Sequence, residues 1–413
     1  MRREGGFRWT REPWLTAALF ALSLWGLAMI YSAGVLNVPS PVTSGLWIRH
    51  AVLLVLSMTG FLYATRISAR WFEWVSYPAF VFWVGVLGVT LFVGTGVGTA
   101  AGVKAFLSIG GFRFQPSEAA KIATILALAR LLASRDRPPR FLRDLLAPAA
   151  LVGLPLALVV RQPDLGTAMA FAGILFAGLY WAGTPWPLLL LLASPGLALV
   201  LSFDTRLWAA YVLLLFGGLY MYRFRLDLAE SVTVFLANVA AGTIAQPLWS
   251  SLAEYQRNRI LVFIDPNVDP RGAGWQLIQS KVAVGSGGLL GKGFTLGTQK
   301  RLDFLPEQHT DFIFGVLGEE FGFVGTSLTL LLFAYVFFHM IRMAESSKDP
   351  FAGLVIFGTL GAWLTHVFVN VGMTIGLVPI TGIPLPFISY GGSFLLMSWL
   401  AAGIMIRVAN EEP

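Results

Sequence analysis

Long apolar runs with almost no charge follow one another along nearly the whole chain, and this feature restricts the fold more than any other. A helix needs about 20 such residues to cross the hydrocarbon core of a bilayer. A backbone inside a bilayer must also satisfy its own hydrogen bonds, which favours helices. We therefore predict an all-α polytopic membrane protein, a single domain over 1–413, with about twelve transmembrane helices at 14–35, 47–65, 73–94, 117–133, 144–161, 165–183, 186–203, 206–222, 229–249, 312–341, 351–376 and 385–408.

Composition excludes several kinds of site. The chain is 56% hydrophobic and only 12% charged, so most of its surface must face lipid or other helices. It has no cysteine, and its four histidines show no spacing typical of a zinc site. We therefore predict no metal centre. Any catalysis would depend on carboxylates, hydroxyls or lysines.

The net charge of +7 has two explanations, nucleic-acid binding or membrane orientation. Arginine and lysine gather before the first run and then in alternate connections, at 66–70, 130–143, 223–225, 342–348 and 407. This alternation is the positive-inside pattern. It predicts that both termini are cytoplasmic and that nucleic acid is not a partner. The first run is too long for the apolar part of a signal peptide and lacks a clear A-x-A cleavage site, so we predict that it is a retained helix.

Two predicted outer segments are longer than ordinary connections. Residues 95–116 are rich in glycine, and residues 250–311 form a segment of about sixty residues. The second segment contains Trp275, Leu277, Val284 and Leu290 among other apolar residues, which is too apolar for disorder. We expect a structured extracellular segment that folds against the outer face.

Charged residues inside spans are costly, so each one indicates a candidate site. Glu118 and Lys121 begin the fourth run, and their spacing places them on one helix face. They could form an ion pair that only stabilises the bundle. Alternatively Lys121, with nearby Arg113 and Lys104, could hold an anionic headgroup such as a pyrophosphate at the helix N-terminus.

Two aspartates stand where apolar runs begin. Asp164 interrupts two runs and is typical of a helix cap, although it could also pair with Lys121 or Arg113. Asp311 precedes the tenth run. Glu319 and the glycines 315, 318 and 322 follow it at helical spacing. We predict that this face lines a cleft, with Asp311 at its outer rim.

Two glycine-rich stretches remain. Residues 285–293 look like a phosphate-binding loop, but Ser286 and Gly293 occupy positions where that motif requires other residues, so we predict a tight, close-packed turn. Residues 382–393 open the last run with proline and glycine. A broken helix of this kind is more typical of a cavity wall than of a lipid-facing surface.

These motifs together resemble the SEDS family (shape, elongation, division and sporulation) of membrane peptidoglycan glycosyltransferases. The matching strings are FQPSEAAK at 114–121, QPDLGTA at 162–168, RILVFIDPNVDPRGAGWQLIQSKVAVGSGG at 259–288, GTQKRLDFLPEQHTDFIFGVLGEEFGFVG at 297–325 and PITGIPLPFISYGGS at 379–393. They occur in the family's order along nearly the whole chain. The GTQ, FLPEQHTDFIF and GIPLPF strings are more similar to the elongation member than to the division member.

The resemblance implies an activity and several roles. The substrate would be lipid II, an undecaprenyl-pyrophosphate disaccharide-pentapeptide that is polymerised at the outer face of the bacterial cytoplasmic membrane. The family's essential carboxylate falls on Asp311, and its Glu and Lys fall on Glu118 and Lys121. Asp164 and Ser389 become further candidate substrate contacts. A class B penicillin-binding protein would be the partner.

The resemblance also marks where the chain departs from the family. The family has ten spans, so twelve imply an inserted helix pair near 202–228. Residues Ala105 and Phe106 follow Lys104 where the family often has Arg-Trp, and His366 stands where Gln is usual. No cofactor is required, although a divalent cation at Asp311 or Glu307 is compatible with the carboxylates.

Three functions compete at this stage. A bundle with charged groups inside the membrane could polymerise lipid II, transport it across the bilayer as a flippase, or act as a scaffold for a partner synthase. Asp311 and the structured segment face the outer side, where product is built. This placement favours the polymerase in elongation, with the septal, division-type member as a further alternative.

Overall fold

The helix α14 (Pro350–Ile375) is the centre of the molecule, and most of its residues are buried. A computed structural model describes residues 12–38, 43, 45–96, 104–110, 112–221, 227–305 and 307–411. Asp349 caps α14 by accepting a hydrogen bond from the Phe351 amide, and Pro350 occupies the first turn, where its missing N–H costs nothing. Gly376, with φ of 76°, ends the helix.

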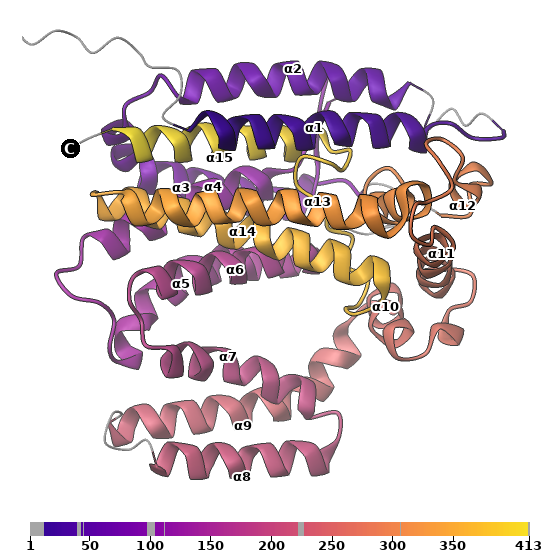
Figure 1. The fold of residues 1–413 in the computed structure, drawn as a ribbon. Coiled ribbons are helices and arrows are strands. Elements are labelled where there is room, and N and C mark those ends of the chain that lie inside the picture. Colours follow the sequence, from indigo (N-terminus) through magenta and orange to yellow (C-terminus); the bar gives the residue numbers. More distant parts are fainter. Residues whose placement is uncertain are drawn as a thin grey trace, which may run out of the picture.

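Helices on two sides cover α14 (Figure 1). On one side a hydrophobic cluster joins it to α1 (Pro13–Ala33), α2 (Leu46–Ala64), α13 (Ile313–Ser346) and α15 (Gly392–Asn410). On the other side a second cluster joins it to α3 (Ala69–Val93), α4 (Pro116–Ala133), α5 (Leu142–Arg161) and α6 (Leu165–Trp181).

Three helices lie at the edge of the second cluster, away from α14. They are α7 (Trp186–Leu201), α8 (Thr205–Met221) and α9 (Leu228–Ser251), and Figure 1 shows α8 and α9 at the edge of the bundle. The side chains of Ser194, Tyr211 and Asn238 join the three helices: Asn238 Nδ2 donates to Ser194 Oγ at 2.8 Å, and Tyr211 Oη donates to Asn238 Oδ1 at 3.0 Å.

The all-α polytopic prediction is confirmed. Each of the twelve predicted runs corresponds to one long helix of the described chain. Eight of the described helices are long and apolar enough to cross a membrane, and α6, α7 and α8 are apolar but shorter. The last helix begins at Gly392 instead of 385, because residues 377–391 form an irregular segment. A short hairpin of β1 (Leu107–Ile109) and β2 (Phe112–Phe114) was not expected.

Within the described residues, 202–221 and 227–228, the region 202–228 contains one whole helix, α8, and not two. If two helices are additional to a ten-helix core, the second is α7 or α9, and the inserted pair stays a proposal. The predicted cytoplasmic connection at 223–225 lies outside the described residues.

The segment 250–311 is structured, as predicted. It contains α10 (Glu254–Ile264), a short 3-10 turn η1 (Pro266–Val268), α11 (Ala273–Ser286) and α12 (Thr298–Arg301). These helices gather at one end of the bundle (Figure 1). A third hydrophobic cluster, which includes Val262, Leu277 and Leu305, packs the segment against Val316 of α13 and Met373 of α14.

Candidate functional site

Asp311 lies in the turn that enters α13, immediately before the helix begins. Glu307 has a positive φ of 52°, and its carbonyl accepts hydrogen bonds from the amides of Thr310 and Asp311, both at 3.1 Å. This turn brings the Glu307 and Asp311 side chains to the same side of the chain. Thr310 Oγ1 donates to Glu307 Oε2 at 3.4 Å and also hydrogen bonds to Asp311.

The irregular segment 377–391 forms a wall beside Asp311. Gly382 has a φ of 73°, and a Cβ added there would lie 3.1 Å from Asp311 Oδ2. Only glycine therefore allows the backbone to approach the carboxylate so closely. Asn370 of α14 fixes this arrangement, because its Nδ2 donates to the carbonyls of Asp311 at 2.8 Å and Ile383 at 2.7 Å.

Ser389 supports the same wall from beneath. Its side chain is buried, its hydroxyl donates to the Thr310 carbonyl at 2.6 Å, and it accepts from the Leu385 amide at 2.8 Å. Both interactions are made with backbone. The structure therefore favours a positioning role for Ser389 over the direct substrate contact predicted from the sequence.

Arg259 of α10 brings a cation to Asp311. Its Nη1 donates to the Thr381 carbonyl at 3.5 Å and lies 3.7 Å from the position that a Cβ on Gly382 would occupy. The guanidinium and the Asp311 carboxylate therefore face the same glycine. No local sequence pattern predicts this proximity, because Arg259 and Asp311 are far apart in the chain.

The environment makes Asp311 a stronger base than an ordinary aspartate. Burial, together with the negative charge of Glu307, raises the pKa of Asp311 to about 7, and the positive charge of Arg259 limits the rise. A carboxyl whose pKa lies near the working pH is suited to accept a proton. The turn thus supplies a base and Arg259 supplies an adjacent positive charge.

Asp164 caps α6, as the capping alternative predicted. Its Oδ1 accepts from the Thr167 amide at 3.0 Å, and its Oδ2 accepts from Thr167 Oγ1 at 2.7 Å and from Gln115 Nε2 at 2.9 Å. The other alternative, pairing with Lys121 or Arg113, is wrong: these amide and hydroxyl donors occupy the carboxylate, and Lys121 pairs elsewhere. Gln115 was not anticipated.

Glu118 and Lys121 form the predicted ion pair, with Lys121 Nζ 2.9 Å from Glu118 Oε2. Both side chains are buried, and Lys121 Nζ also contacts Nε2 of His366 at 2.8 Å. Arg113 and Lys104 are exposed on and beside the β-hairpin. Their predicted grouping with Lys121 around one headgroup stays a prediction.

The predicted acidic face of α13 does not line a cleft. Cβ atoms added at Gly315 or Gly318 would contact Ser280 and Val284 of α11, so these glycines allow two helices to pack closely. Gly322 interrupts the helix with φ of 61°, and the freed amides of Phe323 and Val324 bond to the carbonyls of Gly288 and Leu289. The glycine-rich stretch is thus the predicted close-packed turn.

Two buried carboxylates of α13 anchor the segment 250–311. Glu319 Oε1 accepts from Lys292 Nζ at 2.7 Å and from the Gln299 amide at 2.9 Å. Glu320 pairs with Lys300 at 2.8 Å, and neither side chain of that pair is exposed to solvent. Ser32 of α1 donates to Glu320 Oε1 at 2.6 Å. These contacts fix α12 against α1 and α13.

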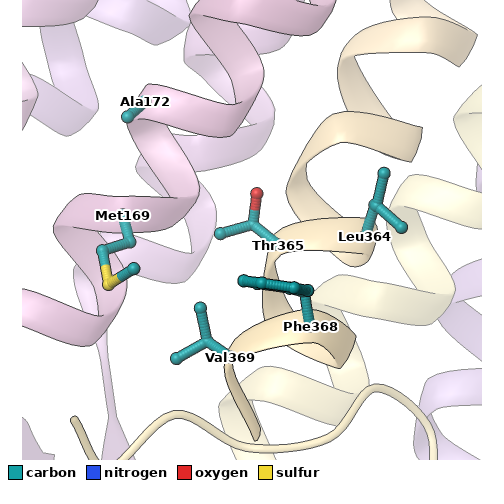
Figure 2. Close-up of a pocket in the computed structure, with 6 residues that line it drawn as sticks. All are labelled: Met169, Ala172, Leu364, Thr365, Phe368 and Val369. Carbon is teal, nitrogen blue, oxygen red and sulfur yellow. The ribbon is translucent and has the colours of Figure 1, made fainter. Parts of the chain in front are cut away.

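An apolar cavity of about 410 Å³ lies between α6 and α14. Figure 2 shows side chains from the two helices facing each other across it. It adjoins the polar site in sequence, because Val369 precedes Asn370 and Met169 follows Thr167 by two residues. Its lining residues are Met169, Ala172, Leu364, Thr365, Phe368 and Val369.

No group of three or more His, Asp or Glu side chains in the described ranges is placed to hold a metal ion. Glu307 and Asp311 are two carboxylates without a third close partner of this kind. A divalent cation at Glu307 and Asp311 therefore stays a prediction, and the described residues add no further ligand of this kind.

The sequence profile of the FtsW/RodA/SpoVE family, described as cell cycle proteins, matches residues 13–215 and 209–413. The peptidoglycan glycosyltransferase RodA of Treponema pallidum is 33% identical over 96% of this chain and 97% of its own length. The peptidoglycan glycosyltransferase MrdB of Escherichia coli is 33% identical over 97% of this chain and 94% of its own length. A probable peptidoglycan glycosyltransferase FtsW of Coxiella burnetii is 32% identical over 100% of this chain and 99% of its own length.

Solved structures share the fold. A chain from a peptidoglycan synthase complex that coordinates polymerization and crosslinking superposes with a TM-score of 0.69, at 28% identity, over 96% of each chain. The rod shape determining protein RodA of Thermus thermophilus superposes with a TM-score of 0.61, at 24% identity, over 96% of this chain and 95% of its own.

Proposed function

This chain belongs to the FtsW/RodA/SpoVE family of cell cycle proteins, and from that membership we infer that it is a peptidoglycan glycosyltransferase that acts in cell elongation. Full-length similarity to curated glycosyltransferases supports the activity, and the RodA-type relatives support the elongation role. We further propose lipid II as the substrate, because glycan strands require a lipid-linked disaccharide precursor at the outer face.

The single observation that carries the proposed mechanism is the position of Asp311 beside Arg259. Glycosyl transfer requires the acceptor hydroxyl to lose a proton while the pyrophosphate of the donor leaves. Asp311, with a pKa of about 7, takes the proton. Arg259, which faces the same wall at Gly382, stabilises the negative charge of the leaving pyrophosphate.

Other site residues take supporting roles in this proposal. Lys121, held by Glu118, adds positive charge beneath the site, and Arg113 and Lys104 extend the cationic surface at the hairpin. Asp164 and Gln115, which hydrogen bond to each other, offer polar groups to the sugars. The apolar cavity between α6 and α14 accommodates part of the prenyl chain.

The multi-pass helices place the protein in a membrane. We propose that this is the bacterial cytoplasmic membrane, with both termini in the cytoplasm, because basic residues gather in alternate connections. We also propose a class B penicillin-binding protein as the partner. The support is the similarity to a chain of a synthase complex that couples polymerization to crosslinking.

Purified protein reconstituted into liposomes with fluorescent lipid II tests this function against the alternatives. A polymerase converts lipid II into long glycan strands that a muramidase digests. A flippase moves lipid II between leaflets without changing it, and a scaffold does neither. Lipid II transport without glycan, in liposomes that contain the partner synthase, would overturn the assignment.

A further inference from the structure

His366 of α14 connects the buried ion pair to the wall beside Asp311. Its Nε2 lies 2.8 Å from Lys121 Nζ, and its Nδ1 lies 3.0 Å from the Pro384 carbonyl. Lys121 pairs in turn with Glu118 at 2.9 Å. One hydrogen-bonded chain therefore runs from α4 through α14 to the segment 377–391.

The chemistry of the two neighbours fixes the state of the imidazole. A lysine ammonium only donates hydrogen bonds and a carbonyl only accepts them. His366 must therefore accept from Lys121 at Nε2 and donate to Pro384 from Nδ1. The ring is neutral, with its proton on Nδ1, and it uses both nitrogens.

The burial of this chain makes each contact costly to lose. His366 is 1% exposed, Glu118 4% and Lys121 5%. The His366 ring stacks on the Phe394 ring of α15, with the two ring centroids 4.7 Å apart. Lys121 Nζ lies 5.3 Å from the centre of the Phe394 ring. Water cannot readily replace a missing partner here, so an unpaired ammonium or carbonyl would carry its full desolvation cost.

The Pro384 carbonyl, which His366 holds, is adjacent to the Ile383 carbonyl, which Asn370 holds beside Asp311. Asn370, one turn along α14, holds the carbonyls of Ile383 and Asp311. His366 and Asn370 thus hold two consecutive carbonyls, at 383 and 384. These follow directly on Gly382, where an added Cβ would lie 3.1 Å from Asp311 Oδ2.

We propose that His366 is a positioning residue for glycosyl transfer: through its two ring nitrogens it fixes Lys121 on one side and the Pro384 carbonyl on the other, so that Gly382 stays against Asp311. The proposal rests on the proposed function for its activity readout. His366 touches neither the reacting sugar nor Asp311, and it acts through the residues that it holds.

The decisive variants differ in what their side chains can donate and accept. The amide of His366→Gln can accept from Lys121 and donate to Pro384, whereas His366→Met fills similar space and cannot donate. Because only the glutamine can restore both hydrogen bonds, we expect it to retain kcat within about threefold and the methionine to lose about tenfold or more. A packing role alone would make methionine at least as good as glutamine.

A double-mutant cycle tests whether His366 acts through Lys121. In a Lys121→Met background, His366→Met should reduce kcat by a clearly smaller factor than in the intact protein, because the Lys121 contact is already lost and only the hydrogen bond to the Pro384 carbonyl remains to be removed. His339→Met, on the far part of α13 away from the site, is the matched control and should leave kcat unchanged. If His366→Met fails to fold, His366→Asn replaces it, because its shorter side chain reaches only one partner.

A spectroscopic readout separates failure of this proposal from failure of the proposed function. With ¹⁵N-labelled histidine, the His366 signal, assigned by its loss in His366→Gln, should report the Nδ1-protonated tautomer, and Lys121→Met should disturb it. If the wild-type protein makes no glycan, the proposed function is refuted, and the ¹⁵N signal alone then shows whether His366 holds both partners. An Nε2-protonated ring, or equal activity of the Met and Gln variants, would overturn the proposal.

Discussion

Asp311 differs from an ordinary surface aspartate because of three neighbours. Glu307 brings a second negative charge, Arg259 brings a positive charge, and Gly382 lets the backbone approach the carboxylate. These neighbours come from three different parts of the chain. Burial and the negative charge of Glu307 raise the pKa of Asp311 to about 7, and the positive charge of Arg259 limits the rise.

The pH dependence of turnover should report this environment. Asp311 acts as a base only when ionised, so kcat/KM should fall as the pH drops through about 7. Glu307→Gln removes a negative charge that raises the pKa of Asp311, so the acidic limb should move to lower pH. The measurement is the initial polymerisation rate between pH 5 and 9, a range of about 4 units that spans the acidic limb.

The direction of the shift distinguishes an electrostatic effect from general damage. Arg259→Gln removes a positive charge and should move the limb to higher pH, whatever it does to the maximum rate. Glu254→Gln, at an exposed position on α10, should leave the limb in place. An unchanged limb in Glu307→Gln would mean that Glu307 does not tune Asp311.

At the scale of single residues, the sequence predicted part of the site. The position of Asp311 just before α13, the Glu118–Lys121 pair and the Asp164 cap all follow from spacing at helix starts. Arg259, Gln115 and His366 were not predicted as site residues, because each becomes important only through a partner far away in sequence. The burial of Ser389 was not predictable from the sequence either.

Among the elements, α12 depends on a buried ion pair. Lys300 and Glu320 are both inaccessible to solvent, and burial lowers the pKa of Lys300 while Glu320 opposes this. Removing one partner leaves the other charge buried, so Lys300→Met or Glu320→Gln should each destabilise the protein by about 3–5 kcal/mol. The double variant should be more stable than either single one.

Thermal unfolding in detergent measures this difference. Lys348→Met, on the connection between α13 and α14, is the control that removes a lysine outside the buried pair. If the double variant loses as much stability as the two single losses added together, the pair is not coupled. The anchoring of α12 by Lys300 and Glu320 would then need another explanation.

The paired elements α6 and α14 form both a tight contact and a cavity. A Cβ on Gly173 would lie 2.1 Å from Thr365 Oγ1, so the helices touch there, and the cavity opens beside this contact. Ala172→Trp should fill the cavity and raise KM for lipid II with a long prenyl chain. It should change KM little for a short-chain analogue, because that analogue does not need the cavity.

Kinetics with the two lipid lengths check this expectation. Leu213→Trp, on α8 and 71% exposed, is the control for adding an indole to a surface away from the cavity. The same rise in KM for both lipids would show that Ala172→Trp distorts the polar site. In that case the prediction that the cavity holds a prenyl chain would fail.

For the whole molecule, the sequence predicted the number and order of long helices well. Apolar runs mark them directly, because lipid demands about 20 apolar residues per crossing. The helices α10, α11 and α12 and the β-hairpin were less predictable, since their folding depends on packing against α13 and α14. The kink of α13 at Gly322 likewise depends on carbonyls offered by residues 288–289.

The peripheral helices α8 and α9 suggest a test of which part of the bundle is essential. Only Leu219 is buried in α8, and both helices lie at the edge in Figure 1. Joining Ser202 to Leu252 removes the two helices and keeps the outer segment on its side. Ser194 then loses Asn238 but still donates to the Leu191 carbonyl at 2.7 Å.

We expect this deletion to retain polymerase activity within about tenfold, or ~1.4 kcal/mol of activation free energy. The assay is glycan synthesis by protein that elutes as a single species in detergent, with intact protein as the reference. Complete loss of activity in a correctly inserted deletion protein would place α8 and α9 in the catalytic core or at the partner interface.

The most direct test of the central claim is the rate of glycan synthesis from lipid II by Asp311→Asn. Asparagine has nearly the same shape but cannot accept the proton, so strand synthesis should fall to background while lipid II binding and thermal stability stay close to those of the intact protein. Asp311→Glu should also lose most activity, because an added methylene displaces the carboxylate from the acceptor. Glycan synthesis by Asp311→Asn at near wild-type rate would contradict the assignment of Asp311 as the base.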